Sequence, residues 1–200
     1  QPVSTISRAV SQLGAEAAIR LLMAASLRPA FASPPLYRLW NHSLVVAAAA
    51  QQLAESTGQV DPGEAFLAGL VHDVGRLAIL ELGRNLQVRL ARLIEAGCDL
   101  VSAEFSLCGM SHADIGELIM NRWRFPVELI AAVKNHHRPE AHNPLAAILY
   151  MVEEYTQANE HRRCTLRRYH ALETLNADED LSERIRPEQF TPVNALKFAA

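Results

Sequence analysis

The chain has 200 residues, half of them hydrophobic, and a net charge of −3 when its eight histidines are counted as neutral. This composition allows one medium-sized domain with a sizeable core, and it excludes a strongly basic nucleic-acid-binding chain. The three cysteines have no CxxC spacing, no apolar run reaches the about 20 residues of a membrane span, and no signal-peptide pattern opens the chain, so we expect a soluble protein in a reducing compartment.

Apolar residues recur at helical spacing along most of the chain, and no stretch alternates with the period of two that is typical of strands. Glycine and proline punctuate these stretches, as they do at helix ends. The predicted helices span residues 4–14, 15–28, 33–58, 61–80, 84–96, 99–107, 111–123, 125–137 and 143–160. The sequence therefore predicts an all-α fold.

Capping residues support several of these boundaries. Asp61 precedes a proline and stands three residues before Glu64, a combination that favours a helix start. Ser111 and Asp114 form a capping-box pair at the next such start, and Gly58 is placed to end the helix before Asp61.

From about residue 157 the chain becomes more charged and only weakly amphipathic. We therefore divide it into a helical domain, 1–157, and a helical extension or linker, 158–200. The basic stretch HRRCTLRRYH at 161–170 is interpreted first as a solvated helix face, with an anion or nucleic-acid contact as the alternative.

Ionisable side chains interrupt the most apolar helices. His72 and Asp73 are adjacent in LVHDVGRL, where burial is costly unless a partner compensates both groups. Similar residues stand on other predicted helices, at His42, His112, His136, His137 and Glu153. A bundle could bring them to one centre, and imidazole and carboxylate are ligands of Zn, Fe, Mn and Ni.

Two interpretations of these residues remain open at this point. In the first, they hold one or two divalent metal ions. In the second, the protein is a plain helical scaffold whose histidines are hydrogen-bonded in the core or half exposed. The pair at 136–137 ends a helix, where the helix dipole favours protonated imidazole.

Four phrases in order resemble the HDOD family, the HD-related output domain of bacterial signalling proteins: LWNHS, EAFLAGLVHDVGRLAILEL, GMSHADIGELIMNRWRFPVELIAAVKNHHRPE and PLAAILYMVEEY. The resemblance covers about residues 5–157 and implies an HD-domain-like helical bundle from bacterial cytoplasm. The family's usual N-terminal helical subdomain has no match before Gln1, so we expect a fragment of a longer protein.

The resemblance also implies a ligand set, because the family is related to the HD metal-dependent phosphohydrolases and the HD-GYP phosphodiesterases. His42 resembles the first ligand, His72 and Asp73 the doublet, His112 an intermediate histidine, His136 and His137 the pair, and Glu153 stands at the position of a late Asp. Arg76 replaces the Lys that often follows the doublet, and Arg38 stands where some two-metal relatives carry Glu. RPEAHNP replaces the GYP loop, so hydrolysis of cyclic-di-GMP is not expected.

The resemblance favours a signal-transduction output module that binds metal, as a structural staple, and acts through a regulatory protein partner or a sensor or receiver domain of a longer chain. The alternative is a metal-dependent phosphohydrolase acting on a nucleotide or another phosphorylated small molecule. In that case Asp73 would bridge two ions or orient a water molecule, and Arg76, with Arg38, would offset charge on the phosphate.

Overall fold

The structure is a computed structural model that describes residues 34–138, 143–156, 166–178 and 180–181. These residues form helices and contain no strand, so the predicted all-α class is confirmed. The helices are α3 (Pro34–Thr57), α4 (Pro62–Val71), α5 (Gly75–Glu81), α6 (Arg84–Glu95), α7 (Leu100–Cys108), α8 (His112–Arg122), α9 (Val127–Asn135), α10 (Pro144–Thr156) and α11 (Leu166–Thr174). The helices predicted at 4–14 and 15–28 lie outside the described residues.

The predicted caps are present. The Asp61 side chain accepts a hydrogen bond from the Glu64 backbone N–H, 2.9 Å away. Ser111 and Asp114 form a complete capping box at the start of α8. Gly58 follows the end of α3 with φ +65°, a left-handed conformation that suits glycine.

The predicted continuous helix over 61–80 is wrong at its centre, because residues 72–74 form a turn between α4 and α5. Hydrogen bonds there span three residues: the Val74 N–H donates to the Val71 carbonyl and the Arg76 N–H to the Asp73 carbonyl. Tertiary packing explains the break, since a Cβ on Gly75 would stand 2.0 Å from the His112 carbonyl oxygen. The chain therefore turns at the doublet so that α5 can lie against α8.

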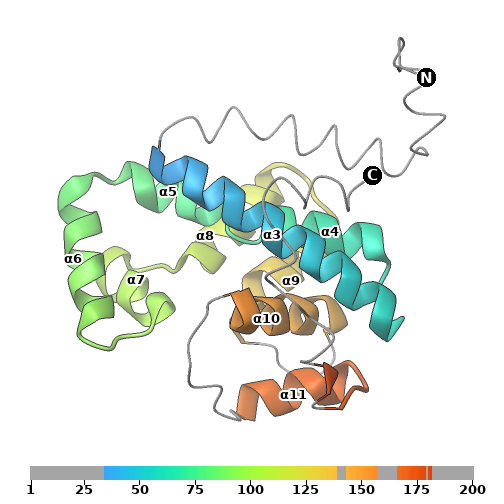
Figure 1. The fold of residues 1–200 in the computed structure, drawn as a ribbon. Helices are drawn as coiled ribbons and strands as arrows, with labels where there is room; N and C mark the ends of the chain where they lie inside the picture. The colour runs from blue at the N-terminus through green and yellow to red at the C-terminus, as the bar shows by residue number, and fades with distance from the viewer. Residues whose placement is uncertain (1–33, 139–142, 157–165, 179, 182–200) are drawn as a thin grey trace, which may run out of the picture.

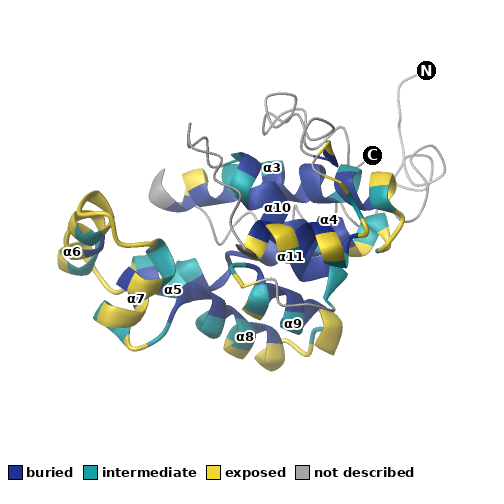
Figure 2. Ribbon diagram, turned by 90° about the horizontal axis from the view of Figure 1, so that it is seen from below, coloured by how far each residue is buried: buried dark blue, intermediate teal, exposed yellow. Residues whose placement is uncertain are grey.

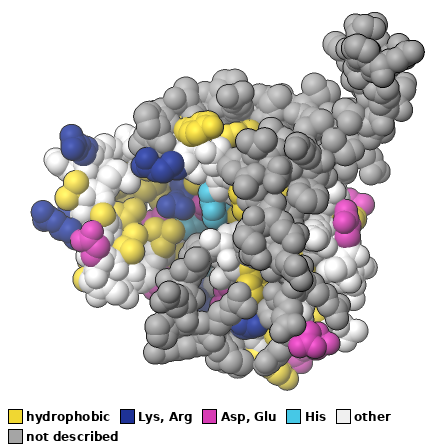
Figure 3. All heavy atoms as spheres, in the orientation of Figure 1, with side chains coloured by type: hydrophobic (Ala, Val, Ile, Leu, Met, Phe, Trp, Pro, Cys, Tyr) yellow, Lys and Arg dark blue, Asp and Glu magenta, His cyan; other side chains and the backbone are white. Residues whose placement is uncertain are grey.

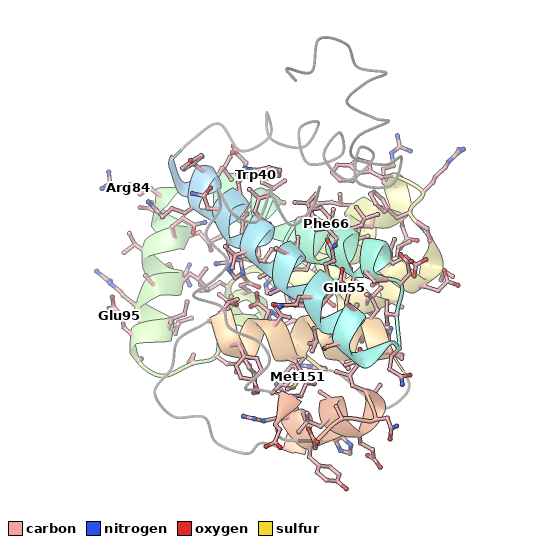
Figure 4. All side chains as sticks on the ribbon, turned by 45° about the vertical axis from the view of Figure 1, so that its right-hand side comes forward. Trp40, Glu55, Phe66, Arg84, Glu95 and Met151 are labelled. Carbon is pink, nitrogen blue, oxygen red and sulfur yellow. The ribbon has the colours of Figure 1, made fainter. Side chains whose placement is uncertain are left out.

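Helices α3, α4, α9 and α10 enclose the main hydrophobic core (Figures 1 and 2). Helix α10 is buried along most of its length, and α3 crosses α4 closely enough that a Cβ on Gly69 would lie 2.6 Å from Ala47 Cα. Phe66, labelled in Figure 4, is 1% exposed within this core. Because α4 ends inside the core, the residues that follow it are delivered to the centre of the molecule.

Helices α6 and α7 form a small lobe at one side of the main body (Figure 1). A second apolar cluster, separate from the main core, joins Leu90 and Ala103 of the lobe to Ile79 of α5. Much of its surface is exposed in Figure 2, and Figure 4 shows Arg84 and Glu95 at the two ends of α6. The lobe is thus a second, smaller packing unit attached beside α5 and α8.

The last helix of the described residues, α11, packs on α10. Within the basic stretch 161–170, residues 161–165 lie outside the described residues, and Arg168 departs from the predicted solvated face. It is buried and donates a hydrogen bond to the Tyr155 hydroxyl at 3.1 Å. No helix in the described part of the chain combines the length and the apolar character that a bilayer crossing requires.

Candidate metal centre

All of the predicted ligands converge on one place in the main body. The seven residues come from five places in the chain: α3, the turn after α4, the first residue of α8, the end of α9, and α10. In chain order they are His42, His72, Asp73, His112, His136, His137 and Glu153. Three overlapping groups of these residues have ligand atoms within 4.8 Å of one another.

Three fully buried histidines are held through the same ring nitrogen. Nδ1 of His72 lies 2.7 Å from the Gly69 carbonyl, Nδ1 of His136 contacts the Val133 carbonyl, and Nδ1 of His112 lies 2.5 Å from Glu104 Oε2. Carbonyl and carboxylate oxygens only accept hydrogen bonds, so each Nδ1 carries the hydrogen. This leaves Nε2 of each ring as the atom that faces the centre, the arrangement in which a second shell orients metal-binding imidazoles.

The Nε2 atoms lie close together. Nε2 of His112 is 3.3 Å from Nε2 of His136 and 2.9 Å from Nε2 of His137. Since Nδ1–H of His112 and of His136 is already donated, their Nε2 lone pairs face each other unless a cation lies between them. A proton or a metal ion can fill that role.

Two carboxylates, Asp73 and Glu153, complete the cluster. Oδ2 of Asp73 lies 3.6 Å from His72 Nε2, while Oδ1 lies 3.3 Å from His112 Nε2. Oε1 of Glu153 lies 2.7 Å from His42 Nε2 and 3.2 Å from His72 Nε2. Asp73 therefore stands between a group formed by His42, His72 and Glu153 and a group formed by His112, His136 and His137.

Electrostatics at the centre favour positive charge. Burial opposes protonation of His72, but Asp73 and Glu153 outweigh it and raise its pKa to about 9. Burial also opposes ionisation of both carboxyls. Even so, Arg76 and nearby imidazoles hold the pKa of Asp73 well below its usual range, and hydrogen bonds from His42 and His72 do the same for Glu153.

The histidine pair at the end of α9 is held neutral. Burial and the neighbouring imidazoles lower the pKa of His136 well below its ordinary value. Burial, followed by the charge of His112, lowers the pKa of His137 to about 4. Neutral imidazoles beside ionised carboxylates are the protonation states in which metal ligands bind, so this pair and the two carboxylates fit a divalent ion, which would replace the proton of His72.

Two arginines flank the opening of the cluster. Arg76 donates a hydrogen bond to Asp73 Oδ2 at 3.0 Å. Arg76 and Arg38 line a pocket of about 240 Å³ together with Leu39, His42 and Leu80. The His42 side chain is 26% exposed there, and Figure 3 shows histidine atoms at the surface beside Lys and Arg side chains. An anion entering this pocket would meet both guanidinium groups.

One residue that contacts the predicted ligands was missed from the sequence. Glu104, on α7, is 1% exposed and accepts hydrogen bonds from both the ring and the backbone N–H of His112. The available signal was that Glu104 is the one charged residue of α7 (LVSAEFSLC). Glu154, next to the predicted Glu153, accepts a hydrogen bond from the Tyr150 hydroxyl.

The fold and the cluster together define an all-α domain with a buried set of histidines and carboxylates. The sequence profile of the HDOD domain family matches residues 1–139, and the chain belongs to this family. The resemblance found in the sequence is thereby confirmed.

Individual relatives match at low sequence identity, and the first two below are solved structures with a similar fold. An HDOD domain protein of unknown function from Geobacter sulfurreducens is 22% identical, with a TM-score of 0.78 over 100% of this chain and 75% of that one. A proposed phosphohydrolase from Shewanella amazonensis SB2B is 24% identical, with a TM-score of 0.75 over 99% of this chain and 78% of that one. An uncharacterised protein of Treponema pallidum (strain Nichols) is 26% identical over 148 residues, and the chain spans 29% of its length.

Proposed function

We propose that this chain is an HDOD output module of a signalling protein, built around one or two divalent metal ions. The observation that carries the proposal is the shared orientation of three buried histidines, His72, His112 and His136. Each is fixed through Nδ1, so that each Nε2 faces a centre lined by carboxylates. Without a cation at that centre, burying these polar groups would cost several kcal/mol.

The residues present form two ligand groups. One ion would be held by His42, His72 and Glu153, and a second by His112, His136 and His137, with Asp73 between them. Nitrogen and oxygen donors of this kind suit Fe, Mn, Ni or Zn. Because the ligands come from α3, α8, α9, α10 and the turn after α4, an ion here would tie these elements together.

In this role the module acts through other proteins or domains, as the family resemblance implies. The metal stabilises the folded state, and a regulatory partner or a sensor or receiver domain of a longer chain uses the module's surface. Such a site needs no substrate, and it differs from an enzyme site in having no free coordination position.

Metal analysis of protein prepared without an affinity tag tests the proposal. We expect Fe, Mn, Ni or Zn to co-purify and to be lost in His72→Ala and Asp73→Ala. His170→Ala is the matched control, because His170 lies on α11 outside the cluster and should leave the metal content unchanged. A wild-type chain that neither contains nor takes up any of these metals contradicts the proposal.

A second candidate function is hydrolysis of a phosphoester, and the arginine-lined pocket favours it. A divalent ion at the cluster would supply Lewis acidity and lower the pKa of a nearby water. Arg76 and Arg38 would bind phosphate oxygens at the pocket. Asp73 lies near both His72 and His112, and it would hold these two histidines in place. The relative from Shewanella amazonensis, described as a proposed phosphohydrolase, supports the same chemistry.

Turnover of a phosphoester and nucleotide panel by the metal-loaded protein separates the two candidates. If the chain is an enzyme, Asp73→Ala abolishes turnover and Arg76→Ala reduces it, whereas Arg84→Ala, on the exposed end of α6, leaves it unchanged (Figure 4). Activity that survives Asp73→Ala excludes the enzyme proposal. Bound metal without turnover supports the module that acts through partners.

A further inference from the structure

Glu104 joins the small lobe to the metal centre. It lies on α7, next to Ala103 of the second apolar cluster, yet its side chain extends to the first residue of α8. Its Oε2 accepts from His112 Nδ1 at 2.5 Å and from the His112 backbone N–H at 2.8 Å. One carboxylate oxygen thus holds both the ring and the backbone of a predicted ligand.

The second oxygen of Glu104 shows that this arrangement has a cost. Among the described residues, the buried Oε1 has no hydrogen-bond partner. An unsatisfied buried acceptor costs about 1–3 kcal/mol, and more when the group is charged. The Ser111–Asp114 capping box satisfies the N–H groups of Ser111 and Asp114, so Glu104 also caps α8 at the His112 N–H. A cap does not involve the imidazole, so the contact of Oε2 with His112 Nδ1 gives the carboxylate a second role, in holding the ring.

We infer that Glu104 is a positioning residue that fixes the Nε2-coordinating tautomer of His112 for a bound metal ion. The inference rests on the proposed metal centre. With Nδ1–H donated to Glu104, Nε2 of His112 is directed at His136, His137 and Asp73. Without that acceptor the ring can carry its hydrogen on Nε2, where it cannot coordinate, or rotate away.

The negative charge of Glu104 adds to this effect. A carboxylate that accepts from the far nitrogen raises the basicity of the coordinating nitrogen, and loss of such an outer partner typically costs 10–100-fold in metal affinity. Glu104→Gln keeps an acceptor oxygen but removes the charge. Glu104→Leu removes both. The two variants therefore separate orientation of the ring from its electrostatic activation.

The experiment combines zinc titration of the whole chain with ¹⁵N NMR of the histidine rings in the metal-free protein. We expect Glu104→Gln to weaken zinc binding about 10-fold and Glu104→Leu about 100-fold. The His112 resonances, assigned with His112→Gln, should keep the Nδ1–H signature in Glu104→Gln and lose it in Glu104→Leu. Glu95→Gln, which removes an exposed charge at the end of α6, should match the wild type in both measurements (Figure 4).

The outcomes distinguish this inference from the proposed function. Zinc bound by Glu104→Leu as tightly as by the wild type, or an unchanged His112 tautomer in that variant, overturns the positioning role. A wild-type chain that binds no zinc, iron, manganese or nickel overturns the metal centre, while the NMR comparison still tests the tautomer. If Glu104→Leu does not fold, zinc titration of Glu104→Gln in a His112→Ala background tests the inference instead. A residue that acts through His112 adds no further loss of zinc affinity in that background, and a further loss there overturns the inference.

Discussion

The main body and the α6–α7 lobe differ in the size of their apolar clusters. The main body buries most of α3, α4, α9 and α10, whereas the lobe has an apolar cluster of only a few side chains. The main body also holds the buried histidines and carboxylates at its centre. Only the larger core offsets the desolvation cost of such a polar cluster, and the lobe contributes to it a single carboxylate, Glu104.

Because of this difference, we expect substitutions in the two regions to have different effects. Changes in the main body should alter stability and metal binding together, because the same helices form the core and carry the ligands. Changes in the lobe should lower local stability and affect the metal centre mainly through Glu104, which contacts His112 directly. The predictions below test this separation.

Removal of metal should have the largest effect. An ion present at about 1,000 times its dissociation constant stabilises the folded state by about 4 kcal/mol. For a chain of this length, that corresponds to a fall in melting temperature of about 8–16 °C on chelation. Amide hydrogen exchange should then increase in α3, α4, α9 and α10 more than in α6. An unchanged melting curve in chelator would mean that no metal stabilises the main body.

Two glycines offer the next comparison. A Cβ at Gly75 would meet the His112 carbonyl oxygen at 2.0 Å and the Gly116 backbone nitrogen at 2.7 Å, and neither backbone atom can move aside easily. We expect Gly75→Ala to lower the free energy of unfolding by about 3 kcal/mol and to weaken metal binding, because α5 and α8 carry or flank ligands.

Gly109 in the lobe is the matched position. Its φ is +74°, but a Cβ there would meet no atom within 4 Å. Gly109→Ala should therefore cost about 1 kcal/mol, from backbone strain alone, and leave metal affinity unchanged. Denaturant unfolding and zinc titration of both variants measure the difference. Equal losses of stability would show that the α5–α8 contact is not the constraint that we describe.

The sequence was sufficient to predict most of the described helices and the set of residues that converge. Periodicity and caps such as Asp61 and Ser111 are local signals, and the predicted boundaries agree with the structure at both sites. The convergence of His42, His72 and His136 depended on the family resemblance as well, because spacing alone left the plain scaffold open. Their role as metal ligands stays a prediction.

Two features depended on tertiary contacts that carry no local signal. The break at residues 72–74 follows from the approach of α5 to α8 at Gly75, and a single glycine within an apolar helix does not specify that approach. Glu104 contacts a residue eight positions along the chain, across a helix boundary, so helical spacing could not pair it with His112. Arg168 is similar, since its burial depends on the position of Tyr155.

Helix caps should have smaller effects that also separate the two regions. Ser111 is buried and forms a reciprocal capping box beside His112, whereas Asp99 caps α7 at an exposed position. We expect Ser111→Ala to cost about 1–2 kcal/mol and to weaken metal binding, and Asp99→Ala to cost about 1 kcal/mol without that effect. Unfolding and zinc titration of both variants provide the measurement. Weaker metal binding in Asp99→Ala would contradict the expected separation between the lobe and the metal centre.

The smallest expected effect is an acid dependence of the lobe. Hydrogen bonds from the Ser102 hydroxyl and backbone N–H lower the pKa of Asp99 below its ordinary value of 3.8. A carboxyl with a depressed pKa stabilises the folded state above the pKa of the unfolded chain, and this contribution disappears as the pH falls through the folded pKa. Because Asp99 is exposed, solvent screening limits the effect to a few tenths of a kcal/mol.

Asp99→Asn isolates this contribution, since asparagine caps a helix without the charge. In metal-free protein, so that the ligand histidines do not add their own acid dependence through metal release, the variant should be slightly less stable than the wild type at pH 7. The two should converge as the pH falls through the folded-state pKa of Asp99, as measured by denaturant unfolding at each pH. A difference that persists at low pH would mean that Asp99 stabilises α7 through its geometry rather than its charge, and the lobe would then lack this electrostatic contribution.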